Sequence, residues 1–135
     1  MSPEVSLEIP SRSPYVGVVR LAVSALARTS GFTEEQVEDL KIAVSEACAN
    51  AVIVTEEAGR QDAVSVSYSD DGGRVIIEIG DRGQSDPGSP DDEADSMGIS
   101  SRLVMSMALV ESLVDEYEIV PREGGGNVTR LVVSH

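Results

Sequence analysis

The segment Glu38–Val54, with the sequence EDLKIAVSEACANAVIV, decides the fold because it predicts a long and largely apolar helix. Within its apolar part lie Glu46 and Asn50, which are four residues apart and therefore point the same way on a helix. Buried polar groups need a hydrogen-bond partner, because burial without one is costly. An amide oxygen can ligate a hard cation such as Mg²⁺, and a carboxylate can position or deprotonate a nucleophile. The pair therefore marks a candidate site, although such a pair can also simply cap a neighbouring loop.

Length and composition predict a single domain, residues 1–135, with one aliphatic core. Hydrophobic residues make up 41% of the chain and the mean hydropathy is -0.04, as in soluble globular proteins. No apolar run approaches the ~20 residues of a membrane span, and no signal peptide precedes the first strand. The sole cysteine, Cys48, cannot form an internal disulfide. These features predict a cytoplasmic protein without a membrane segment.

The formal charge of -14 argues against direct binding of nucleic acid. Neutralising phosphates requires clusters of Lys and Arg, and the ten basic residues of this chain are scattered. A basic protein partner is compatible with such a charge. An acidic surface also serves solubility, so the charge alone does not identify a partner.

The remaining patterns predict a hairpin-rich sheet with helices gathered on one face. Ser13 is expected to cap a first helix that begins at Pro14, and Thr33 and Gln36 form a capping box for the long helix. In chain order, we expect a strand at 5–9, helices at 14–28 and from 34 to before 59, strands at 64–68 and 75–79, a loop at 80–98, a helix at 99–114, and strands at 117–120 and 128–133. This order predicts an α+β fold, a two-layer α/β sandwich with a mixed, mostly antiparallel sheet.

Asp81 and Gly83 directly follow a predicted strand. The carboxylate could accept a hydrogen bond from an exocyclic amine such as adenine N6. Glycine permits close approach or positive φ at position 83. Taken alone, an Asp-x-Gly after a strand is mostly a turn, so the pair gains meaning only from its place among the other motifs.

Taken together, the ordered motifs resemble the GHKL ATPase superfamily with its Bergerat fold, also described as a histidine-kinase-like ATPase fold. Within it, the chain is similar to the small anti-sigma factor serine/threonine kinases of bacterial stress and sporulation switches. The resemblance covers almost the whole chain. The matching segments are VSEACANAV at 44–52, IEIGDRGQSDP at 77–87, LVESLVDEYEIV at 109–120 and GGGNVTRLVV at 124–133.

The resemblance implies a role for each matching polar residue. Glu46 would be the general base that acts on a substrate serine, and Asn50 would ligate the Mg²⁺ that bridges the phosphates of ATP. Asp81 would bind adenine, with Gly83 beside it. Phosphoryl transfer requires mainly positioning and charge neutralisation, which such a site can supply.

The same resemblance assigns the polar loop at about 82–98 as an ATP lid that ends at Gly98. Asn127 occupies the place of a threonine that the family carries in its last hairpin, and it would contribute to nucleotide binding. Arg20, on the first predicted helix, would contact a partner protein, although a solvated helix arginine is the simpler interpretation. The implied partners are a sigma factor, a STAS-domain anti-sigma factor antagonist and a second copy of the chain.

The chain departs from the family pattern at several positions. Val54 stands near a position that is usually histidine, and Ser85 replaces the second glycine of the Asp-x-Gly-x-Gly box. Val104 and Ser106 fall where a count back from residue 109 places glycines at the end of the lid. Lost glycines endanger the backbone amides that hold phosphates.

Two further functions therefore stay open beside an active kinase. A binding module with the same fold could sequester a sigma factor without efficient catalysis. A histidine-kinase catalytic module working in trans is the other alternative, but no sensor or dimerisation segment accompanies the domain. The only histidine, His135, argues against a Ser-His-Asp hydrolase and against a phospho-accepting histidine in this chain.

Overall fold

The structure is a computed structural model that describes residues 4–83 and 97–135, with side chains described to residue 83 and from residue 102 onward. Five strands form one sheet in the order β1-β2-β3-β5-β4, and each neighbouring pair is antiparallel. The strands are β1 Glu4–Ile9, β2 Val64–Asp70, β3 Arg74–Gly80, β4 Glu116–Pro121 and β5 Asn127–Ser134. The expected α+β sandwich is thereby confirmed.

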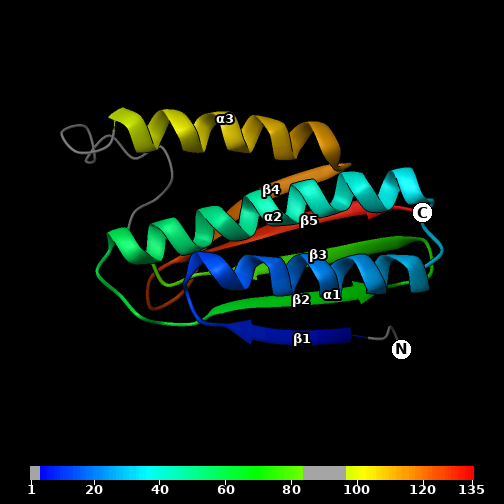
Figure 1. Cartoon of the computed structure of the whole chain (residues 1–135), viewed down its shortest axis with the longest axis horizontal. Coiled ribbons are helices and arrows are strands. Elements are labelled where there is room, and N and C mark those ends of the chain that lie inside the picture. Colours follow the sequence, from blue (N-terminus) through cyan, green and yellow to red (C-terminus); the bar gives the residue numbers. More distant parts are fainter. Residues whose placement is uncertain (1–3, 84–96) are drawn as a thin grey trace.

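Helices cover one face of this sheet (Figure 1). Helices α1 and α2 lie side by side across the strands, and α3 runs alongside α2 near the sheet edge formed by β4. Their bounds are α1 Val16–Thr29, α2 Glu34–Glu57 and α3 Met97–Leu113. The central helix α2 therefore contacts a helix on each side, and its Glu46 and Asn50 can meet residues of α3.

The start of α2 follows local sequence rules. The Thr33 hydroxyl accepts a hydrogen bond from the Gln36 amide at 3.2 Å, and the Gln36 side chain accepts one from the Thr33 amide at 2.9 Å. Each bond satisfies a backbone donor that the first helical turn would otherwise leave unpaired. The predicted capping box is thus confirmed.

The start of α1 differs from its prediction. Ser13 does not cap the helix, since Ser13–Tyr15 forms a short 3-10 turn and α1 begins at Val16. Pro14 lies in the first positions of that turn, where its fixed φ suits the tighter geometry. The predicted cap at Ser13 is wrong because proline favours the beginning of either kind of helix.

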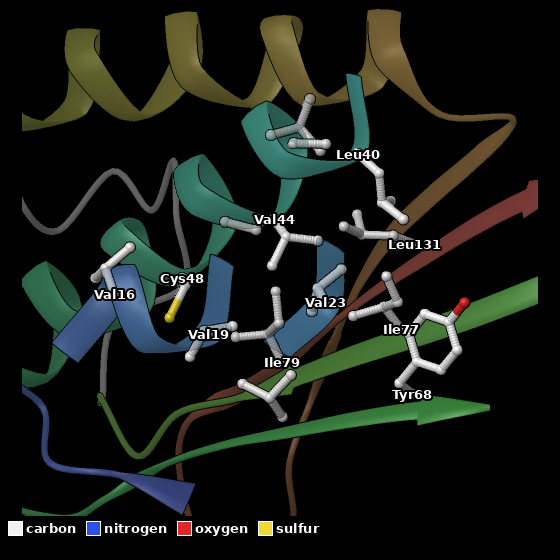
Figure 2. Close-up of a cluster of buried hydrophobic side chains, with 14 of the residues drawn as sticks. Val16, Val19, Val23, Leu40, Val44, Cys48, Tyr68, Ile77, Ile79 and Leu131 are labelled. Atoms are coloured by element: carbon white, nitrogen blue, oxygen red, sulfur yellow. The ribbon is translucent and has the colours of Figure 1, made fainter. Parts of the chain in front are cut away.

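The core lies between helices α1 and α2 and the sheet (Figure 2). The strands alternate as expected, with Val64, Val66 and Tyr68 of β2 buried and the intervening serines more exposed. Other fully buried side chains come from both layers and are Val19 and Val23 of α1, Val44 and Cys48 of α2, Ile77 and Ile79 of β3, and Leu131 of β5. Each large aliphatic side chain contributes about 1.5–3 kcal/mol by burial, so this contact fixes α2 on the sheet.

Among the described residues, none of the helices combines the length and the apolar character that crossing a lipid bilayer requires.

Candidate active site

A hydroxyl group joins the two polar residues of α2 to the neighbouring helix. The Ser106 hydroxyl, on α3, donates to Glu46 Oε2 at 2.7 Å. The Ser106 hydroxyl oxygen also accepts a hydrogen bond from Asn50 Nδ2 at 2.8 Å. Glu46 and Asn50 thus lie on one face of α2, as the spacing predicts, and that face points toward α3. The contact with Ser106 was not expected from the sequence.

Asp81 lies at the end of β3, next to the start of β5, and is 5% exposed. Its Oδ1 accepts hydrogen bonds from the backbone amides of Gly83, at 2.9 Å, and Asn127, at 3.3 Å. Burial raises the pKa of the Asp81 carboxyl above its ordinary value, while both amides and the nearby Arg122 oppose that shift. The carboxylate is therefore held in a fixed orientation by backbone groups.

Gly83 lies directly against α2. A Cβ at this position would stand 2.0 Å from Val54 Cγ1 and 3.0 Å from the Val54 carbonyl carbon. Its φ is not positive, so close approach rather than backbone conformation demands glycine here. Val54 is therefore the α2 residue that Gly83 contacts.

The hairpin before β5 supports Asp81 from the other side. Gly126 has a φ of +90°, and a Cβ there would stand 2.0 Å from the carbonyl oxygen of Asp81. The Asp81 amide donates to the Asn127 carbonyl at 2.9 Å, and Arg122 Nη1 donates to the Asp81 carbonyl at 3.1 Å. The sequence alone did not predict a role for Gly126 or Arg122 at this site. The run of three glycines was the available indication that a backbone approaches closely there.

A small cavity lies between α2, α3 and the sheet. Asn50, Asp81 and Asn127 line it together with apolar side chains of α2, α3 and β4, among them Leu103 and Tyr117. Its volume is about 20 Å³, which suits roughly one water molecule and falls far below the ~300 Å³ of typical ligand pockets. In this arrangement α3 packs against α2, and the cavity between these described residues is too small for a purine.

The other predicted site residues are Gly98 and Arg20, which lie on α3 and α1. Gly98 is the second residue of α3, and most of the expected lid, residues 84–96, lies outside the described residues. Arg20 is an exposed residue of α1 whose Nε donates to Ser45 Oγ at 2.7 Å. Arg20 therefore lies at the junction of α1 and α2. Its partner Ser45 immediately precedes Glu46 on α2.

The described part of the chain contains no group of three or more His, Cys, Asp or Glu residues arranged to hold a metal ion. A Mg²⁺ that binds mainly through substrate phosphates does not require such a group. Asn50 fits that case, because its Nδ2 donates to Ser106 and its Oδ1 is the atom that can ligate a hard cation.

Comparison with known proteins shows what the chain is similar to. The family model of the histidine kinase-like ATPase domain matches residues 9–133. The serine-protein kinase RsbW of Bacillus licheniformis is 33% identical over 125 residues, covering 85% of this chain and 76% of that protein. The RsbW of Bacillus subtilis strain 168 is 30% identical over 130 residues, with 89% and 79% covered.

A solved structure supports the fold. The crystal structure of the RsbU and RsbW domains of a Mycobacterium tuberculosis protein superposes with a TM-score of 0.72 at 21% identity. That match covers 98% of this chain and 33% of the longer chain. The resemblance to GHKL ATPases is thereby confirmed, and the chain belongs to the histidine kinase-like ATPase domain family and, within it, to the RsbW family of serine-protein kinases.

Proposed function

We propose that the chain is an anti-sigma factor that binds Mg-ATP and phosphorylates a serine on a STAS-domain anti-sigma factor antagonist. As a member of the RsbW family it is an ATP-dependent protein kinase. The observation that carries the proposal is the meeting of Asn50 and Asp81 at one cavity, with Glu46 one helical turn away on the same face of α2. Phosphorylating the antagonist would control how much sigma factor is free, as in a stress response.

Asp81 is the proposed contact for adenine. Because the amides of Gly83 and Asn127 fix Oδ1, the carboxylate keeps one orientation in which its other oxygen can accept the exocyclic amine. Asn127 takes part through its backbone here, and we propose that it also contributes to the nucleotide site. Gly98, in the first turn of α3, is the proposed end of the lid over the phosphates.

Glu46 is the proposed general base. Its Oε2 already accepts a hydrogen bond from a serine hydroxyl, which is the contact that a base needs with an acceptor serine. The oxygen of the substrate serine would form the bond to the γ-phosphorus, and the bond from that phosphorus to the β–γ bridging oxygen would break. The proton of the substrate serine would pass to Glu46. Asn50 Oδ1 would hold Mg²⁺, which neutralises phosphate charge when bound.

The proposed partners are a sigma factor, the antagonist and a second copy of the chain in a homodimer, all in the cytoplasm. Arg20 is the proposed partner contact, since it is exposed on α1 and lies close in space to the α2 turn that carries Glu46. The net charge of -14 would attract a basic surface of a partner protein toward this protein.

The first test is calorimetric titration of Mg-ATP into the wild-type protein and the Asp81→Asn variant. We expect micromolar binding that depends on Mg²⁺ and is lost in the variant. Transfer of phosphate to a cognate STAS protein should then disappear in Glu46→Ala. Undiminished transfer in that variant would remove Glu46 from the role of base.

A second candidate function is a sigma-factor-binding module with weak catalysis. The observation that favours it is the closed cavity, with Ser106 bonded to Glu46 and Asn50 where the family places glycine. Robust turnover with a partner serine would reject this alternative.

A further inference from the structure

The Ser106 hydroxyl occupies both polar residues of the α2 site at once. It donates to Glu46 at 2.7 Å and accepts from Asn50 at 2.8 Å, so it acts as donor and acceptor together. The Ser106 residue is 6% exposed, so water competes little for these bonds. A hydrogen bond to a carboxylate is among the stronger kinds.

This arrangement conflicts with occupancy by nucleotide and acceptor. One carboxylate oxygen of Glu46, the proposed base, is already bonded to an internal serine. The neighbouring cavity, at about 20 Å³, is too small for a purine. Helix α3 must therefore move away from α2 before the site can fill, and this movement breaks both bonds of Ser106.

We propose that Ser106 is a positioning residue that holds α3 closed over the ATP site and thereby lowers the affinity of the protein for nucleotide. The inference rests on the proposed function, because it takes Glu46 and Asn50 as groups of that site. A protein whose binding-competent form is only a fraction of the population binds with an apparent Kd raised by that fraction. The two Ser106 bonds stabilise only the closed form, so they lower this fraction.

Apolar contacts hold α3 independently of Ser106. Leu103 is 7% exposed and Val110 is 1% exposed, and these residues lie one turn before and one turn after Ser106. Removal of the hydroxyl should therefore leave α3 folded, while the protein spends a larger fraction of time in the open form.

The experiment compares Ser106→Ala with Ser112→Ala by calorimetric titration of Mg-ATP and Mg-ADP. Ser112 is a matched control, because it is an exposed serine of the same helix whose one hydroxyl bond within the described residues is to the Leu109 carbonyl. We expect Ser106→Ala to bind both nucleotides about tenfold more tightly than wild type, the size expected for losing such bonds from one state. Ser112→Ala should bind like wild type.

Hydrogen exchange of the α3 amides gives a second readout without nucleotide. Exchange should be faster in Ser106→Ala than in wild type, and unchanged in Ser112→Ala. A merely structural role for Ser106 would lower the melting temperature without tightening nucleotide binding, so the direction of the affinity change separates the two roles. If the alanine variant folds poorly, Ser106→Cys provides a second test, because it keeps a side chain of similar shape with a much weaker donor, and its affinity for nucleotide should also rise.

The outcomes distinguish this inference from the function on which it rests. Nucleotide binding by wild type that is equal or weaker in both Ser106 variants would overturn the inference and leave the kinase proposal intact. Absence of binding in wild type and in both variants would overturn both.

Discussion

Gly83 contacts Val54 so closely that any side chain at position 83 would begin 2.0 Å from Val54 Cγ1. This contact places the loop after β3 directly on α2. It therefore fixes Asp81, two residues earlier, relative to Asn50 on the helix. The spacing between the proposed adenine contact and the proposed Mg²⁺ ligand thus depends on a glycine.

We expect Gly83→Ala to weaken Mg-ATP binding and to lower the free energy of unfolding by about 1–3 kcal/mol, as overpacking does elsewhere. Urea unfolding and calorimetric titration measure the two effects. Gly73→Ala is a matched control, because a Cβ at position 73 meets nothing within 4 Å and its φ is not positive. Equal effects of the two substitutions would show that the contact with Val54 is not the cause.

Asp81→Asn should separate binding from stability. Burial raises the pKa of the Asp81 carboxyl, so the charged form is disfavoured in the folded protein. A neutral amide of the same shape can still accept the bonds from Gly83 and Asn127 through its oxygen. The free energy of unfolding at pH 7 should therefore stay the same or rise, whereas nucleotide binding should be lost. A variant that unfolds easily would instead make Asp81 a structural residue.

Local sequence patterns predicted the helices and strands, but they could not predict contacts between residues far apart in the sequence. The capping box at Thr33 and the alternation of Val64 and Val66 are properties of neighbouring residues, and both were read correctly. The bond between Ser106 and Glu46 joins residues 60 positions apart, so no local pattern could reveal it. The close approach of Gly126 to Asp81 depends likewise on the pairing of β3 with β5. The spacing of four between Glu46 and Asn50 is a local property, so the sequence did predict that the two side chains share one face of α2.

Stability should fall in acid partly through Asp70. Its carboxylate contacts His135 Nε2 at 2.9 Å and the Gly72 amide at 2.8 Å, and these bonds lower the pKa of Asp70 from 3.8 to about 2. The His135 ring also lies edge-on to Phe32, with 5.2 Å between centroids. In Figure 1 the C-terminus accordingly lies near the connection between α1 and α2.

A lowered folded-state pKa means that this stabilisation is complete above about pH 4 and disappears as the pH falls toward 2. Urea unfolding at several pH values should therefore show a steeper loss across this window in wild type than in Asp70→Asn. His135→Ala removes the largest cause of the shift, so it should flatten the same part of the curve. Identical pH profiles in all three proteins would contradict the assignment.

Cys48 should be unreactive in the folded protein. It is fully buried in α2, and burial raises the pKa of its thiol to about 11. Since the thiolate is the reactive form, a disulfide reagent at pH 8 should label Cys48 only at the rate at which the protein opens. Labelling in the native state should thus be slow and become complete in denaturing urea. Rapid native labelling would show that the core around α2 opens readily.

Arg20→Ala tests the proposed partner surface. Arg20 is exposed and its one described bond is to Ser45, so its loss should change the free energy of unfolding by less than about 0.5 kcal/mol. Affinity for the cognate sigma factor should fall at least about tenfold if this arginine is central to the interface. Arg28→Ala is the matched control, since Arg28 is an exposed arginine of the same helix that pairs with Glu34 at 3.0 Å. Surface-immobilised sigma factor gives both dissociation constants, and equal losses in the two variants would reveal general electrostatics rather than a specific contact.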